Sequence, residues 1–160
     1  MNRVSTLFLK IAVILIGIPI LALCIFAVPR IATYTAEVFP NMAYIPYLVF
    51  IFLYVSAIPF YFALYQAFKL LSFIDKNKAF SKMSVRALKK IKYCAVTIST
   101  LFTAGMPAFY LMAEIDDAPG IIVIGLVIIF ASMVIAVFAA VLQKLLKEAI
   151  DIKSENDLTV

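Results

Sequence analysis

Four long stretches without a charged residue constrain the fold of this 160-residue chain more than any other feature. They run from Ile11 to Pro29, from Val38 to Phe68, from Tyr93 to Ala113 and from Ala118 to Gln143. A bilayer core about 30 Å thick needs roughly 20 predominantly apolar residues for one helical crossing. The stretches lack the alternating pattern of outer-membrane strands, so we expect helices. The sequence therefore predicts an all-α, polytopic membrane protein with four transmembrane helices.

The expected architecture is a single domain over residues 1–160, arranged as an antiparallel bundle. The approximate spans are 8–29, 43–68, 92–113 and 119–143, and residues 150–160 form a short tail. Hydrophobic residues make up 66% of the chain and charged residues 14%, which is far from the composition of a soluble domain. The first stretch resembles a secretory signal, but Leu23 stands where a cleavage site needs a small residue, so we expect a retained helix.

The basic residues are distributed unevenly along the chain. Of the 14 Lys and Arg residues, only Arg30 lies outside the N-terminal segment, the segment 69–92 and the C-terminal segment. Basic residues resist translocation and therefore mark cytoplasmic segments. The sequence predicts that both termini and the segment 69–92 are cytoplasmic, in a multi-pass protein of the bacterial cytoplasmic membrane.

The basic segment 69–92 has local structure of its own. Ser81 is a candidate N-cap, and apolar residues recur at helical spacing after it, so the third helix should begin before the membrane. The second helix should also continue beyond its apolar stretch, giving a short cytoplasmic helical hairpin extension. Its positive charges can be interpreted in two ways. They either set the membrane topology and attract anionic lipids, or they form a docking surface for a cytosolic partner. Direct nucleic-acid binding is not expected, because no recognition module is visible. The candidate contact residues are Lys82, Arg86, Lys89, Lys90 and Lys92, together with Glu155, Asn156, Asp157 and Leu158 of the tail.

Small residues at helical spacing predict contacts between helices in the membrane, because they let backbones approach closely. In the fourth helix these are Ser132, Ala136 and Ala140, which we expect to face the third helix, where Thr100 and Ala104 are the candidates. The same face of the fourth helix is a candidate for homo-oligomer formation.

The chain lacks the side chains that most membrane enzymes and carriers use. It contains no His, and the four apolar stretches contain no Asp or Glu. Usual His-type metal sites and Ser-His or Cys-His nucleophiles are therefore excluded, and a proton-coupled carrier is disfavoured. Lys10 is close enough to the inner boundary to extend its amine to the headgroups. Carboxylates gather in the outer turn at Glu114, Asp116 and Asp117, which we interpret as a solvated turn. We expect no enzymatic activity, no cofactor and no metal.

Two motifs resemble the YoaS-like family of bacterial membrane proteins, whose function is unknown. One is Ala79-Phe80-Ser81 followed by Val85-Arg86-Ala87-Leu88-Lys89, and the other is the terminal Glu155-Asn156-Asp157-Leu158-Thr159-Val160. The segment Asn77-Lys78-Ala79 departs from the family's usual Gly or Asn followed by Pro or Ala. The resemblance covers essentially the full length. It implies a cytoplasmic-membrane protein, often encoded beside a small helix-turn-helix regulator of the Xre type, and it assigns no catalytic or binding residues.

These observations support two functional hypotheses. In the first, the chain is a non-enzymatic adaptor or sensor that binds a cytosolic regulator through its basic loop and tail. In the second, it is a small transporter or permeability protein that acts as an oligomer.

Overall fold

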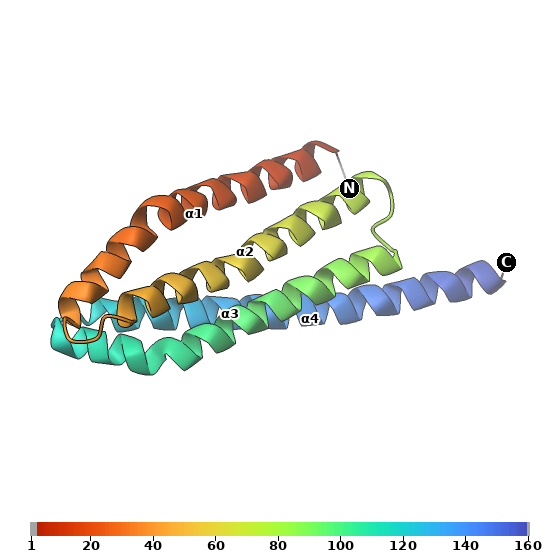
Figure 1. Ribbon diagram of the computed structural model, residues 1–160. Helices are drawn as coiled ribbons and strands as arrows, with labels where there is room; N and C mark the ends of the chain where they lie inside the picture. The colour runs from red at the N-terminus through yellow and green to blue at the C-terminus, as the bar shows by residue number, and fades with distance from the viewer. Residues whose placement is uncertain (1–2, 160) are drawn as a thin grey trace.

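The structure, a computed structural model, describes residues 3–159 and consists of four long helices (Figure 1). They are α1 (Arg3–Val38), α2 (Ile45–Asp75), α3 (Lys82–Ile115) and α4 (Gly120–Thr159), and the described residues contain no strand. Each helix is long and apolar enough to cross a membrane. The predicted all-α architecture with four membrane-capable helices is therefore confirmed.

Charge distinguishes the two ends of the molecule. The start of α1, the connection between α2 and α3 and the end of α4 lie at one end, which we call the basic end (Figure 1). The α1–α2 connection and the α3–α4 turn, with Asp116 and Asp117, lie at the other, which we call the acidic end.

Short turns reverse the chain after α2 and after α3, and both use the same helix-ending geometry. Asn77 has φ 58° and Asp117 has φ 49°, so each occupies the left-handed region. The next amide then donates back into the helix, from Lys78 to the Phe73 carbonyl at 2.7 Å and from Ala118 to the Ala113 carbonyl at 2.9 Å. This is the Schellman arrangement, in which Asn and Asp take the place that Gly usually has.

Helix α3 begins inside the basic segment, as the sequence predicts. Ser81 is extended (φ −135°, ψ 160°), and its hydroxyl accepts a hydrogen bond from the Ser84 amide at 3.4 Å. This is the geometry of an N-cap, which satisfies one of the free donors at a helix start.

Tyrosine hydroxyls join α1 to α2 within the apolar part of the molecule. Tyr54 donates to the Cys24 carbonyl at 2.6 Å, and Tyr61 donates to the Gly17 carbonyl at 2.7 Å. The absent side chain of Gly17 allows this approach, because a Cβ there would lie 3.3 Å from Leu64 Cδ1. Pro19 and Pro29 interrupt the hydrogen bonding of α1, which curves along its length in Figure 1.

Aromatic rings fill the contact between α2 and α3. The ring of Phe52 makes edge contacts with Phe102, at 5.2 Å between centroids, and with Phe109, at 5.9 Å. Gly105 accommodates this cluster, since a Cβ there would be 3.2 Å from Phe52 Cζ. The arrangement of ring edges against ring faces is the one that aromatic quadrupoles favour.

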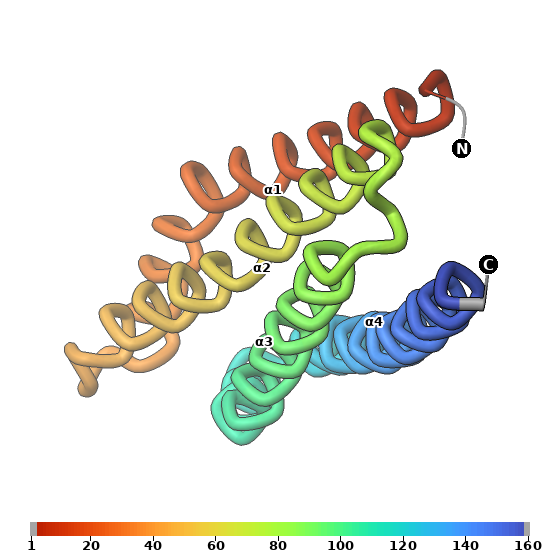
Figure 2. Tube along the Cα trace, turned by 90° about the vertical axis from the view of Figure 1, so that its right-hand side faces the viewer, coloured from red at the N-terminus to blue at the C-terminus, as the bar shows by residue number. Residues whose placement is uncertain are grey.

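The helices form an open layer in chain order. Apart from a small contact between α1 and α3, each described helix contacts only its neighbours in the sequence, and α4 contacts α3 alone (Figure 2). The predicted bundle is therefore not closed, because α1 and α4 do not meet. Large apolar side chains such as Phe8, Phe26 and Phe130 are exposed along the layer. A lipid bilayer covers such a surface without the free-energy cost that water imposes.

Helix α4 is longer than the predicted span. It continues through Ile150 to Thr159, so the segment predicted as a tail is helical over its described residues. Figure 1 shows this end of α4 extending beyond the connection between α2 and α3.

Candidate functional site

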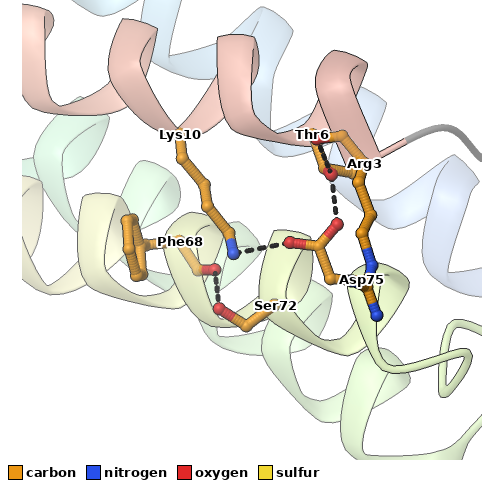
Figure 3. A network of polar contacts seen from close by, with 6 residues as sticks. All are labelled: Arg3, Thr6, Lys10, Phe68, Ser72 and Asp75. Carbon is orange, nitrogen blue, oxygen red and sulfur yellow. Dashed lines mark hydrogen bonds and ion pairs between the residues drawn. The ribbon is translucent and has the colours of Figure 1, made fainter.

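A polar network joins α1 and α2 at the basic end (Figure 3). The Lys10 ammonium lies 2.7 Å from Asp75 Oδ2, and the Thr6 hydroxyl donates to the other carboxylate oxygen. The Arg3 side chain extends alongside the same carboxylate in Figure 3. Lys10 also lies 5.4 Å from the centroid of the Phe68 ring, a cation–π distance. Thr6 is fully buried, so the network forms part of the helix contact.

The charge of Asp75 is stabilised by these neighbours. Asp75 lies beyond the charge-free stretch that ends at Phe68, and the pKa of its carboxyl is below its ordinary value. The hydrogen bond from Lys10 is the largest cause of the lowered pKa, followed by the hydrogen bond from Thr6. Partial desolvation raises the pKa, and the positive charges of Lys10 and Arg3 lower it further. Asp75 is therefore ionised at neutral pH.

Sequence reasoning did not single out Asp75 as a site residue. It expected the Lys10 amine to reach the headgroups, whereas Lys10 pairs with Asp75 in the structure. One feature of the sequence could have identified Asp75 as a site residue: it is the single carboxylate within the basic segment 69–92. Antiparallel neighbours bring the start of α1 beside the end of α2, so an acid there can meet the first basic residues.

The basic residues singled out by the sequence lie along the start of α3. Lys82, Arg86, Lys89 and Lys90 are exposed, and Lys92 is half-buried. The ammonium of Lys92 lies 4.9 Å from the centroid of the Tyr93 ring, which holds it near the helix surface. The structure thus presents these cations at the basic end.

The predicted tail residues belong to the last turns of α4. Glu155, Asn156, Asp157 and Leu158 are exposed, and Val160 lies outside the described residues. Two residues before Glu155, the Lys153 ammonium lies 6.0 Å from the centroid of the Phe80 ring, in the α2–α3 connection. The fold therefore brings the basic start of α3 and the last turns of α4 to the same end of the molecule.

The small residues of α4 face α3. Ser132 and Ala136 are buried and Ala140 is half-buried, and α3 is the helix that contacts α4 in the described residues. Gly125 continues this face, where a Cβ would lie 2.9 Å from Met106 Sδ.

Thr100 and Ala104, the residues of α3 predicted to meet this face of α4, are both exposed in the structure. The Thr100 hydroxyl donates to the Val96 carbonyl at 2.8 Å, and Thr97 and Thr103 make the same bond four residues back. Because their hydroxyls are satisfied within α3, these threonines need no partner on another helix.

The acidic end contains a further link between distant segments. The Tyr34 hydroxyl of α1 donates to Asp116 in the α3–α4 turn. Within residues 3–159 no three His, Cys, Asp or Glu side chains are grouped as a metal site would need. Cys24 and Cys94 are free thiols.

Four membrane-capable helices, each with a long stretch that contains no charged residue, define a multi-pass membrane protein. The chain matches the family model described as "Protein of unknown function (DUF2975)" over residues 30–160, and it belongs to this family. It is also 86% identical, over 160 residues and the full length of both chains, to a Bacillus subtilis (strain 168) protein described as "Uncharacterized membrane protein YoaS". No solved structure matches the chain. The resemblance noted from the sequence motifs is therefore confirmed.

Proposed function

We propose that this protein is a non-enzymatic adaptor or sensor of the bacterial cytoplasmic membrane that binds a cytosolic regulator at its basic end. The observation that carries the proposal is the proximity of two exposed surfaces, the basic start of α3 and the helical extension of α4. Neither surface is needed to cross a membrane, because both lie outside the charge-free stretches.

The orientation follows from the distribution of basic residues. All Lys and Arg residues except Arg30 belong to segments at the basic end, so the positive-inside rule assigns that end to the cytoplasm. Both termini then face the cytosol. A reporter fused after Val160 should be active only in its cytoplasmic form, and activity of a periplasmic reporter would contradict this orientation.

The chemistry of the basic start of α3 favours an acidic partner surface. Its exposed side chains carry positive charge over the first three turns, and such a cluster attracts acidic proteins and anionic headgroups alike. The last turns of α4 add Glu155 and Asp157, which would pair with basic groups of the same partner. A small helix-turn-helix regulator, as the family resemblance implies, is the partner we propose.

Co-purification in mild detergent from the native bacterium tests this function. The intact chain is compared with a chain truncated after Ile150 and with Lys82→Gln/Arg86→Gln/Lys89→Gln/Lys90→Gln, which removes charge without adding acid. Neutralising Lys69, Lys76 and Lys78 instead is the matched control. We expect the intact chain and the control to recover a DNA-binding protein that both variants lose. Equal recovery with all chains would reject the proposal, and the reporter fusion verifies that each variant inserts correctly.

An open groove lined by residues of α1 alone supports the second candidate, a transporter or permeability protein. It has a volume of about 720 Å³ and an apolar lining that includes Pro19 and Phe26. Arg30 and Tyr34 stand at its end nearer the acidic end of the molecule, so an amphipathic molecule with an anionic head would fit its chemistry. The two candidates differ in water accessibility within the membrane part, because a transporter needs a water-filled path there and an adaptor does not.

A further inference from the structure

Helix α4 carries a line of apolar side chains that begins in its apolar stretch and continues into its helical extension, exposed except at the half-buried Ala149. Phe138, Leu142, Leu145, Ala149 and Ile152 follow one another at alternating intervals of four and three residues. Phe138 is 66% exposed, Leu145 56% and Ile152 61%. We call this line the α4 seam. A spacing of this kind, with a mean of 3.5 residues, is the pattern by which helices pair in coiled coils.

The seam is separate from the face that α4 uses within its own chain. That face contains Gly125, Ser132, Ala136 and Ala139, all buried, and it contacts α3. At 100° per residue, the seam lies roughly 130° around the helix from this face. No other described helix contacts α4, so no further helix of the same chain covers the seam.

Part of the seam lies beyond the bilayer. The apolar stretch from Ile121 to Leu142 is roughly 33 Å long at 1.5 Å per residue, which is enough to cross the hydrocarbon core. The next residues include Lys144, Lys147 and Glu148, which mark the aqueous side. Because α4 continues as a helix to Thr159, Ile152 is exposed to water unless another surface covers it.

The charges beside the seam complement a second copy of the same helix. With Leu145 and Ile152 at heptad position d, and Leu142 and Ala149 at a, Glu148 takes position g and Lys153 takes position e. In a parallel pair, a residue at g faces the residue five positions later at e of the partner helix. Glu148 of each copy would therefore face the opposite charge at position 153 of the other, twice per pair.

The membrane supplies the parallel orientation. Every copy inserts in the same direction because the same basic residues set its topology, so two α4 helices side by side must be parallel. Asn156 occupies the next a position, and a single Asn at a favours a parallel pair in one register. Two heptads outside the membrane would be marginal as free peptides, but anchoring in one bilayer raises their effective concentration.

We propose that the α4 seam binds a second copy of this chain, forming a parallel helix pair that continues from the membrane into the aqueous phase at the basic end. Leu145, Ala149 and Ile152 form its apolar contact, and Glu148 and Lys153 fix its register. The Lys153 side chain would exchange its contact with the Phe80 ring for the carboxylate of the neighbouring copy.

Cysteine cross-linking of the full chain in its membrane tests the contact. In a Cys24→Ala/Cys94→Ala background, Ile152→Cys places thiols on the seam, where the two backbones approach closely enough for a disulfide. Lys147→Cys and Asp151→Cys, both exposed on other faces of α4, are matched controls. Mild oxidation should link Ile152→Cys into a homodimer at least about fivefold more completely than either control. Equal linking of all three, no linking at all, or linking of Ile152→Cys to a different protein would overturn the proposal.

A charge exchange in the Ile152→Cys chain tests the register. Glu148→Lys places like charges opposite each other twice per pair, and so does Lys153→Glu, so either should reduce the linked fraction by about five- to tenfold. The double variant Glu148→Lys/Lys153→Glu restores opposite charges and should recover the linking. A double variant as defective as the single ones would exclude this register. The seam requires no cytosolic partner, so this result is independent of the co-purification test of the adaptor function.

Discussion

The Lys10 ammonium and the Asp75 carboxylate, 65 positions apart in the sequence, lie 2.7 Å apart. They join the start of α1 to the end of α2 at the basic end of the molecule. The pair combines a charge-assisted hydrogen bond with a second one from the buried Thr6, which gives it a defined geometry. It lies where the two helices leave the apolar stretches, so it fixes how the start of α1 sits against α2.

We predict that Asp75→Asn weakens the α1–α2 contact. The substitution keeps the shape of the side chain but removes the charge that Lys10 faces, so unfolding in an SDS titration should occur at lower SDS than for the unsubstituted protein. Asp151→Asn, at an exposed position of α4, should leave the midpoint unchanged. In a double-mutant cycle, the effects of Lys10→Met and Asp75→Asn on unfolding stability should not be additive, because the two residues interact. Fully additive effects would show that Lys10 and Asp75 are not coupled.

The contribution of Asp75 should also depend on pH. Its pKa is lowered in the folded protein, so its stabilisation is fully present above the ordinary carboxyl value of 3.8 and disappears as the pH falls through the lowered pKa. The stability difference between the unsubstituted chain and Asp75→Asn should be constant near neutral pH and vanish in stronger acid. A difference that changes between pH 6 and 8 would contradict this assignment.

Side chains added at Gly125 should disturb the α3–α4 contact. A Cβ there would lie 2.9 Å from Met106 Sδ and 3.3 Å from Phe109, so Gly125→Val should destabilise the protein by about 1–3 kcal/mol. Gly120→Val is the matched control on the same helix, because a Cβ at Gly120 meets nothing within 4 Å. Equal stability of the two variants would show that the helices can separate at this point without cost.

The turn after α2 should prefer glycine to alanine at position 77. Asn77 has φ 58°, a conformation that costs a residue with an ordinary Cβ about 1–2 kcal/mol and costs glycine little. Asn77→Gly should therefore be more stable than Asn77→Ala by about this amount, measured by SDS unfolding. The same comparison at Asp117, with φ 49°, should give the same order, and a reversed order at either position would contradict the turn geometry.

We predict that water does not reach the row of threonine side chains on α3, Thr97, Thr100 and Thr103. Thr100 lies within a charge-free stretch, its side chain is exposed and its hydroxyl is bonded within the helix, so Thr100→Cys in the Cys24→Ala/Cys94→Ala background should react slowly with a water-soluble maleimide. Lys89→Cys, exposed at the basic end, should react rapidly. Comparable rates at both positions would indicate a water path at mid-depth and favour the transporter hypothesis.

The charge-free stretches by themselves determined that the chain forms four membrane-capable helices, because a helix satisfies its backbone hydrogen bonds locally and needs only length and hydrophobicity to be recognised. Local chemistry also identified the start of α3 at Ser81, since an N-cap depends on adjacent residues. Tertiary structure alone decided which faces are covered. It left Thr100 exposed, kept α1 apart from α4 and brought Asp75 to Lys10, because these outcomes depend on how helices distant in sequence approach one another.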